Sequence, residues 1–563
     1  MLASSRSKRG VTLIVTLIFI FYLTFRDKPW SLETPIFLRE PLDTFGMSAT
    51  HPAPSSLTNV FQPINILNSA EVAQIANLIR QLNTLGPPAL TKPAACTGRT
   101  LAIEDVTNDT ERRDVTPVSD EQVAQARKAH TRVVDMIRKS SHSVPYKAHT
   151  RGIVTVAGGR YTGALLVTLR MLRRTNSTLP VQVFMPTAGD YDQNTCEVIL
   201  PSLNARCVMI PQYEGLSIAK FQYKIFAVLL SSFEEVLFLD ADNFPIVDPA
   251  AWMGASVFKD TGYVLVRAFL SPHQGFNASI LKLQFGNARF LILDYFIWDA
   301  ELYSFKHARR FLPPPKAFAA PRETQSLTLT QWPDFWWATA SPHYFQVANH
   351  PTPSLLSLGT TESGQLIISK RTHSDVLLLA LYYNIFGPPF YYPLLTQCDA
   401  GQGDKETWLY AVLALGKRYY QVKQKTGILG YHSDDGFHGA SMTQQNPQDD
   451  YSTYRQEREH EHALFRDDDA PDAVFLHHNL VKLSPVEMVA WVRANPGRRM
   501  WGGKKGTVAR FGVDLEGAVW EELVRVACGY GDGLVGWNQD VCGVLMENWR
   551  GIVWKEALEE RAG

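Results

Sequence analysis

The stretch EEVLFLDADNFPIVDP, residues 234–249, sets an uninterrupted apolar run directly before two aspartates that one alanine separates. The run lacks the alternation of a half-exposed strand, which favours a central parallel strand covered on both faces. Asp240 and Asp242 then fall at the carboxyl end of that strand, where open α/β sheets bind ligands. Unpaired buried carboxylates are costly. The pattern therefore predicts a divalent cation held by carboxylate and phosphate oxygens; a simple polar turn is the alternative.

The preceding segment predicts a β-α-β unit. GIVTVAGG (152–159) has the pattern of a short apolar strand that runs into glycines, and LPVQVFMP (179–186) that of a second strand. Between them, YTGALLVTLRMLRR (161–174) spaces its leucines as one face of a helix. Gly158 and Gly159 stand at the first strand-to-helix turn, where backbone can approach a phosphate or sugar closely.

A further helix is predicted over SIAKFQYKIFAVLLSSF (217–233), directly before the aspartate motif. Its expected buried stripe is made of Ile218, Phe221, Ile225 and Val228. Lys220 and Lys224 are four residues apart on another face. They form either a solvated helix face or a basic pair directed at a diphosphate.

The composition excludes one large class of function. The chain has 563 residues, and its 55 basic and 55 acidic residues give a formal net charge of zero. A general nucleic-acid binder would normally carry a basic excess, so no nucleic-acid partner is expected.

The amino-terminal region predicts a membrane anchor. An uncharged apolar segment spans 11–25, no small-residue cleavage site follows it, and three basic residues precede it. We expect a cytosolic tail (1–10), a signal anchor (11–25), a lumenal stem (26–147) that does not share the catalytic core, and a catalytic domain (148–563). One stem helix is expected at 68–85.

The cysteines and glycosylation sequons agree with a lumenal location. None of the six cysteines forms a C-x-x-C pair. Cys196 with Cys207, and Cys528 with Cys542, are the natural local disulfides in an oxidising compartment. Acceptor sequons begin at Asn108, Asn176 and Asn277.

Six sequence blocks together resemble the fungal Golgi α-mannosyltransferases that extend mannan and N-glycan branches. The blocks, in chain order, are GGRYTGALLVTLRMLRR with LPVQVF, SSFEEVLFLDADNFPIVDP, WPDFWWATASP, ESGQLIISK, FYYPLLTQCDAGQGDKET and FLHHNLVKLSP. The resemblance covers roughly residues 148–550. It implies a GT-A-like α/β fold, an open nucleotide-sugar-binding sheet with flanking helices. It also implies GDP-mannose as donor, Mn²⁺, a mannose-containing glycan acceptor, retention of the α configuration, and type II anchoring in the Golgi membrane, with a mannosyltransferase complex as a further partner.

The resemblance also implies a metal site. Asp240 and Asp242 match the family's D-x-D motif, with Asp240 near the metal or the ribose. His477 in FLHHN is the further metal or diphosphate contact, although the adjacent His478 fits the pattern equally well.

Other polar residues in the matching blocks are implied to contact substrate. Donor or acceptor contacts are expected from Gly158, Gly159, Lys224, Asp240, Asn243, Asp334, Gln365 and Lys482. The expected catalytic carboxylates are Asp404 in the GDKE loop, Glu406 as its reserve, and Glu362 in ESGQ. A helix N-cap is the alternative role for Asp404, and no carboxylate can be assigned as a nucleophile.

One segment departs from the family pattern. Residues 263–331 separate two blocks that are almost adjacent in the family, so we interpret them as an insertion or as a translated intron.

Two other functions compete with sugar transfer. A phosphohydrolase of the D-x-D-x-T/V kind is disfavoured because Asn243 and Phe244 follow the motif. A glycan-binding subunit without turnover is disfavoured by the intact acidic blocks. The preference for α-1,2 over α-1,3 linkage rests only on the overall similarity of the blocks to the α-1,2 branch-adding members of the family.

Overall fold

A computed structural model describes residues 66–90, 114, 116–139, 144–267, 340–353, 360–397, 403–424, 426–433, 436–455, 473–479 and 481–562. The predicted anchor at 11–25, Cys96, Cys398, Asn108, Asn277 and Asp334 lie outside these ranges. Within them, no helix is both long and apolar enough to cross a membrane.

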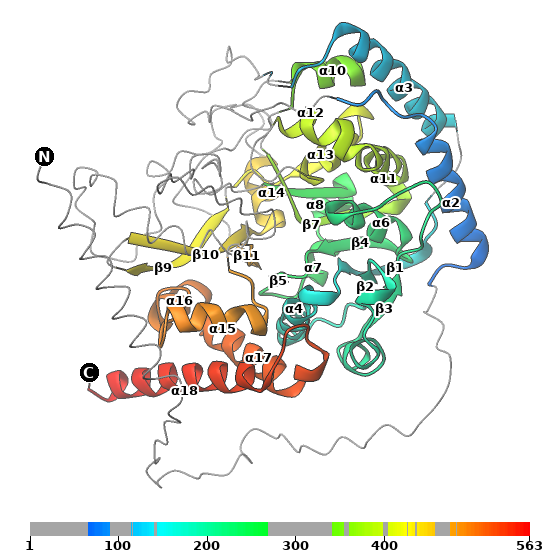
Figure 1. Ribbon diagram of the computed structural model, residues 1–563. Helices are drawn as coiled ribbons and strands as arrows, with labels where there is room; N and C mark the ends of the chain where they lie inside the picture. Colours follow the sequence, from blue (N-terminus) through cyan, green and yellow to red (C-terminus); the bar gives the residue numbers. More distant parts are fainter. Residues whose placement is uncertain are drawn as a thin grey trace, which may run out of the picture. The chain divides into compact units, whose positions relative to one another are not determined.

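A seven-stranded mixed sheet forms the centre of the fold (Figure 1). Its strand order is β3-β2-β1-β4-β7-β6-β8. The pairs β3/β2, β2/β1, β1/β4 and β6/β8 are parallel, and β7 runs antiparallel to both β4 and β6. The strands are β1 (Lys147–Val156), β2 (Val181–Met185), β3 (Ala205–Met209), β4 (Phe233–Leu239), β6 (Tyr263–Arg267), β7 (Thr361–Ser369) and β8 (Tyr420–Gln421).

The central strand β4 is buried on both faces, which explains its continuous apolar sequence. Val236 and Phe238 belong to one hydrophobic core, and Leu237 and Leu239 belong to the other. The predicted central strand is therefore confirmed, with the difference that only one of its neighbours is parallel.

Helices cover the two faces of this sheet. Residues of one core come from α2 (Ser69–Asn83), α3 (Asp120–Lys139), α6 (Tyr223–Leu230), α10 (Pro342–Ala348), α11 (Lys370–Ile385), α12 (Tyr392–Thr396) and α13 (Lys405–Ala414). Residues of the other come from α4 (Thr162–Arg174), α5 (Leu200–Ser202), α7 (Ala250–Met253), α8 (Ser256–Thr261), α14 (Pro447–Arg455), α15 (Pro485–Ala494), α17 (Leu515–Gly529) and α18 (Gln539–Ala562), and α16 (Lys504–Phe511) packs on α17.

A second, four-stranded antiparallel sheet lies beside the end of β4. Its order is β5-β11-β10-β9, and its strands are β5 (Asn243–Pro245), β9 (Gly427–Ser433), β10 (Gly436–Gln445) and β11 (Ala473–His477). Because only three residues separate the end of β4 from the start of β5, the aspartate motif forms the link between the two sheets.

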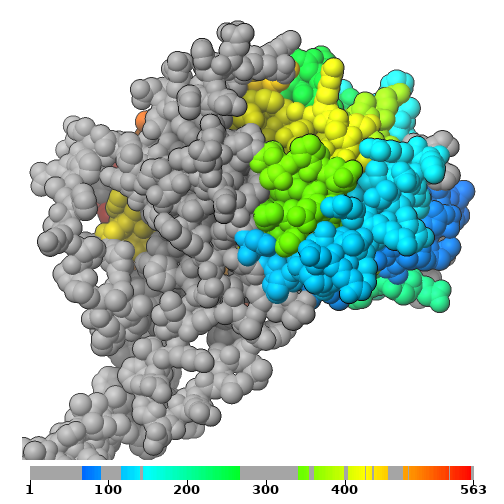
Figure 2. Space-filling model, turned by 90° about the horizontal axis from the view of Figure 1, so that it is seen from above, coloured from blue at the N-terminus to red at the C-terminus, as the bar shows by residue number. Residues whose placement is uncertain are grey.

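The prediction that residues 26–147 do not share the catalytic core is wrong for α2 and α3. Ile75 and Leu82 of α2 and Val133 of α3 are fully buried within the first core. The space-filling view shows α3 beside the segment that carries α10 (Figure 2), in agreement with the contacts between these helices. Both helices are amphipathic, and each places its apolar side on the domain.

The first residues of the predicted insertion at 263–331 are part of the described structure. Residues Tyr263–Arg267 form β6, which pairs with β7 inside the main sheet, and the Tyr263 side chain is fully buried. The predicted insertion therefore begins within the main sheet, and its residues 268–331 lie outside the described ranges.

Two other local predictions have clear outcomes. Both predicted disulfides are confirmed: Cys196 pairs with Cys207 and Cys528 with Cys542. The helix predicted over 217–233 is shorter, since a 3-10 turn, η6 (Lys220–Gln222), precedes α6. Lys220 adopts a left-handed φ of 52°, and Phe221, predicted to be buried, is 43% exposed.

Candidate active site

The link between β4 and β5 lies at the topological switch point of the main sheet. The chain turns from β1 towards β2 and β3 on one side, while β4 lies on the other side of β1. Ligands bind at such a point, outside the carboxyl ends of the strands. Asp240 and Asp242 immediately follow β4, and Gly158 and Gly159 follow β1.

The glycine turn after β1 has a backbone that only glycine adopts easily. Gly158 has a φ of 138° and Gly159 of 53°. A Cβ on Gly158 would lie 2.5 Å from the Cβ of Asp190, so this turn also packs closely against its neighbour. The contacts of this turn explain its glycines structurally, and its predicted approach to a donor stays a prediction.

The ESGQ block forms a bulge in β7. Opposite the consecutive residues Leu265 and Val266 of β6 stand Leu366 and Glu362 of β7, so three residues of β7 have no partner on β6. These are Ser363, Gly364 and Gln365. Bulges redirect side chains and often occur next to active sites. Here the bulge turns four consecutive residues towards the aspartate motif, as the contacts below show.

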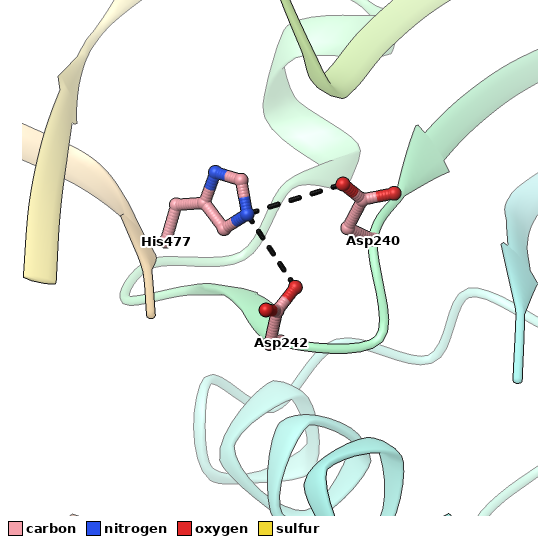
Figure 3. Close-up of side chains that lie close together, drawn as sticks. All are labelled: Asp240, Asp242 and His477. Atoms are coloured by element: carbon pink, nitrogen blue, oxygen red, sulfur yellow. Dashed lines mark ion pairs between the residues drawn. The ribbon is translucent and has the colours of Figure 1, made fainter. Parts of the chain in front are cut away.

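Three predicted ligands converge on one point. The Nε2 atom of His477 lies 3.4 Å from Oδ1 of Asp242 and 3.9 Å from Oδ2 of Asp240. One ligand atom from each residue lies within 4.8 Å of the others. His477 is the last residue of β11, and Figure 3 shows its imidazole pointing at the carboxylates of Asp240 and Asp242. The register explains the meeting, because His477 pairs directly with Asn243 of β5.

The structure separates the two adjacent histidines. His478 is fully buried, and its ring stacks on Phe244 at 5.8 Å and packs on Trp501 at 5.5 Å. Burial lowers the pKa of His478 to about 3. Its imidazole therefore belongs to the core, and His477 alone of the pair faces the carboxylates.

Two lysines flank the aspartates, one on each. Lys482 pairs with Oδ2 of Asp242, and the Nζ of Lys224 donates to Oδ2 of Asp240 at 2.8 Å. Burial raises the pKa of Asp242, but the charges of Lys482 and His477 outweigh this effect and lower it. For Asp240 burial dominates, and its pKa is raised in spite of Lys224.

Lys224 also connects the motif to the predicted catalytic loop. Its Nζ lies 3.1 Å from the Oγ of Ser363 and 4.0 Å from Oδ1 of Asp404. The Asp404 carboxylate further accepts hydrogen bonds from Ser363 at 3.3 Å and from the indole of Trp408 at 2.9 Å. Asp404 precedes α13, yet its side chain does not cap that helix. Burial raises the pKa of the Asp404 carboxyl.

Glu406 has a different environment. Its carboxylate accepts hydrogen bonds from the hydroxyl of Thr360 and from the backbone N–H of Thr361 at 3.2 Å. Burial raises its pKa, although Lys405 opposes this. These contacts fasten α13 to the start of β7, and the catalytic role of Glu406 stays a prediction.

Three buried amide side chains form a cluster next to the aspartate motif. The Asn243 side chain donates to the backbone carbonyl of Gly364 at 3.1 Å, to the Gln365 amide oxygen, and to the Gln444 amide oxygen at 3.3 Å. All three amide residues are at most 1% exposed. This cluster joins β5, β7 and β10, while the Oδ1 of Asn243 and the Nε2 of Gln365 have no hydrogen-bond partner among the described residues. The predicted contact of these two residues with the donor stays a prediction.

The site fits a divalent cation. Asp240, Asp242, Glu362 and Asp404 bring four carboxylates together with two lysines, an excess of two negative charges when His477 is neutral. Carboxylate and imidazole groups are ligands for several divalent metals, so the donor set is compatible with a cation without selecting one. Burial lowers the pKa of His477, but Asp242 and Glu362 outweigh this and raise it, so the imidazole also responds to the uncompensated negative charge.

Sequence reasoning missed Ser363, Trp408 and Gln444. Ser363 lay inside a quoted block and could have been proposed from it. Trp408 lies in an apolar helix and Gln444 in a strand, and nothing in the local sequence distinguishes them from other helix and strand residues.

Comparisons with known proteins identify the family of the chain. A family model described as "Mannosyltransferase putative" matches residues 150–446. Alpha-1,2-mannosyltransferase MNN21 of Candida albicans is 31% identical over 470 residues, which cover 77% of this chain and 66% of the relative. Alpha-1,2-mannosyltransferase MNN2 of Saccharomyces cerevisiae is 30% identical over 378 residues, which cover 60% of this chain and 52% of the relative. The chain thus spans about half to two thirds of the length of these relatives.

Among solved structures, core-mannan synthase A (CmsA/Ktr4) from Aspergillus fumigatus in its Mn/GDP form is 11% identical. The match covers 60% of this chain and 81% of that chain, with a TM-score of 0.26.

Proposed function

The chain belongs to the mannosyltransferase family whose model matches residues 150–446, and from this premise we propose that it is a metal-dependent mannosyltransferase. It would move mannose from GDP-mannose to a mannose residue of a glycan or mannan with retention of configuration. The observation that carries the proposal is the convergence of Asp240, Asp242 and His477 at the switch point of the sheet.

The fold supports a GT-A-like nucleotide-sugar site. Four adjacent strands, β3-β2-β1-β4, run parallel, and the D-x-D motif directly follows the last of them. A diphosphate at this edge would meet the glycine turn after β1 and the lysine beside Asp242.

Asp240, Asp242 and His477 would hold the Mn²⁺, which when bound supplies a Lewis acid for the charge on the departing diphosphate. Lys482 keeps Asp242 in place through one carboxylate oxygen and leaves the other facing His477. With the donor bound, the same ammonium can also contact the diphosphate. In the transfer, the bond from the mannose anomeric carbon to the diphosphate oxygen breaks, a bond to an acceptor hydroxyl oxygen forms, and the hydroxyl proton is released.

Asp404 is a buried carboxylate that three neighbouring side chains hold. Lys224, Ser363 and Trp408 all contact it, so its position is fixed before substrate arrives. Such preorganisation is what a binding or catalytic carboxylate requires. We propose contact with the reacting sugar and assign no nucleophile.

We propose an α-1,2 linkage, because the two curated relatives named above are α-1,2-mannosyltransferases. The α-1,3 linkage remains the alternative. The proposed location is the Golgi membrane, single-pass and type II, supported by the apolar segment 11–25 and its basic flank.

A transfer assay tests this function. The purified protein is incubated with Mn²⁺, an α-1,6-mannan acceptor and either GDP-mannose or UDP-glucose, and the product linkage is determined by NMR. We expect α-1,2-linked mannose from GDP-mannose only. Absence of mannose transfer to every mannose-containing acceptor tried, by protein that binds GDP-mannose, would refute the enzymatic proposal.

A further inference from the structure

Glu362 stands on the far side of the His477 ring from the aspartates. Its Oε1 lies 3.8 Å from Nδ1 of His477, whereas Asp240 and Asp242 face Nε2. That Nδ1 atom is buried, and it has no hydrogen-bond partner among the described residues. A buried polar atom without a partner is costly and requires an explanation.

The structure fixes the Glu362 carboxylate in this position. The same Oε1 accepts a hydrogen bond from the backbone N–H of Gly364 at 2.8 Å, within the bulge of β7. Gly364 lets the ring approach, because a Cβ there would lie 2.6 Å from Cε1 and 2.8 Å from Nδ1 of His477. The bulge therefore supplies both the space for the imidazole and a carboxylate directed at its outer nitrogen.

We propose that Glu362 is a positioning residue for the metal ligand His477, and not a group that contacts the sugar. A carboxylate facing Nδ1 favours the tautomer with the proton on Nδ1, which leaves the lone pair of Nε2 directed at the site of Asp240 and Asp242. Histidine ligands commonly donate their other ring N–H to a carboxylate, and loss of such a partner typically weakens metal binding 10- to 100-fold. This inference rests on the proposed metal site and goes beyond it by naming what orients the ligand.

The test is direct binding of Mn²⁺, measured from the EPR signal of free Mn²⁺ in titrations of the purified chain. Glu362→Met removes the acceptor, and we expect the Kd for Mn²⁺ to rise about 10- to 100-fold. Glu362→Gln keeps an amide oxygen that can accept from the Gly364 N–H and face Nδ1, so its Kd should stay closer to that of the wild type. Glu521→Gln, on the exposed side of α17, is the matched control and should bind like the wild type.

Kinetics separate positioning from a catalytic role. For a positioning residue, the kcat of Glu362→Gln returns towards the wild-type value at saturating Mn²⁺. A kcat that stays low in Glu362→Gln at saturating Mn²⁺, with unchanged Mn²⁺ affinity in both Glu362 variants, would overturn the inference and assign Glu362 to the chemistry.

Asp242→Asn distinguishes failure of this inference from failure of the proposed metal site. If Asp242→Asn binds Mn²⁺ like the wild type, the metal site itself is wrong. If Asp242→Asn loses binding and folded Glu362→Met keeps it, only the positioning role is wrong. Far-UV circular dichroism of each variant confirms that it is folded.

Discussion

Replacing Gly364 with alanine should damage the metal site through steric contact alone. The new Cβ would lie 2.6 Å from the Cε1 atom of His477, whereas non-bonded carbon atoms rest about 3.5–4.0 Å apart. The ring must therefore move by about 1 Å, or the bulge must open by the same amount. Metal–ligand distances tolerate only about 0.2 Å. We expect Mn²⁺ affinity to fall by at least about 10-fold, the lower end of the loss for a missing outer partner.

The assay pairs Mn²⁺ titration with urea unfolding. Overpacking of this kind costs about 1–3 kcal/mol, so the variant should remain folded while its affinity falls. Gly543→Ala is the matched control, because no atom lies within 4 Å of its added Cβ in helix α18; that change should leave Mn²⁺ binding intact and stabilise slightly. A folded Gly364→Ala protein that binds Mn²⁺ like the wild type would refute the argument that His477 is a ligand held against Gly364.

Three further changes test other parts of the structure. Lys224→Met leaves the carboxylates of Asp240 and Asp404 without their shared cation. It should lower the free energy of unfolding by about 3–5 kcal/mol in urea titrations and reduce kcat. Unchanged stability would mean that the lysine is dispensable. Cys528→Ser with Cys542→Ser opens a loop of 14 residues and should cost about 3 kcal/mol in the same experiment, whereas a loss below about 1 kcal/mol would contradict the loop-entropy argument. Burial lowers the pKa of His130 to about 4 from an ordinary value near 6.5, so the unfolded chain binds the extra proton between these values and stability is lost as pH falls from 6.5 through 4. His130→Gln should flatten that part of the stability profile, and an identical profile would show that His130 does not titrate there.

The sequence predicted the centre of the fold because its physical signal is local. A strand covered on both faces needs apolar residues at consecutive positions, and Val236 to Leu239 supply them to two different cores. The polar residues that follow must then lie at the carboxyl end of this central strand. Asp240 and Asp242 could therefore be placed without knowledge of the strands beside it.

The rest depended on pairings between distant segments. The bulge at Ser363–Gln365 follows from the registers in which β7 pairs with β6 and β4. The residues of ESGQ give no local signal that predicts it. Gln444 lies 201 residues from Asn243 in sequence, so its role in the amide cluster has no local signal. His477 and His478 were indistinguishable in sequence, because strand register alone decides which ring faces the carboxylates.

Local backbone and packing choices also escaped prediction. The left-handed φ at Lys220 interrupts the helix predicted over 217–233, so that α6 begins only at Tyr223 and Phe221 is exposed. Helix α2 looked like part of a spacer because proline-containing stretches border it, yet its apolar face fits the domain core. The sequence of α2 is compatible with a helix in a spacer and with a helix of the domain core. Tertiary packing decides between these two roles.

The central claim is that Asp240, Asp242 and His477 hold the metal on which mannose transfer depends. It is tested most directly by measuring transfer of labelled mannose from GDP-mannose to α-1,6-mannan as Mn²⁺ is varied, for the wild type and for Asp242→Asn. We expect transfer that rises with Mn²⁺ and is abolished by EDTA in the wild type, and no transfer above background in the folded variant. Equal transfer by both proteins, or transfer unaffected by EDTA, would contradict it.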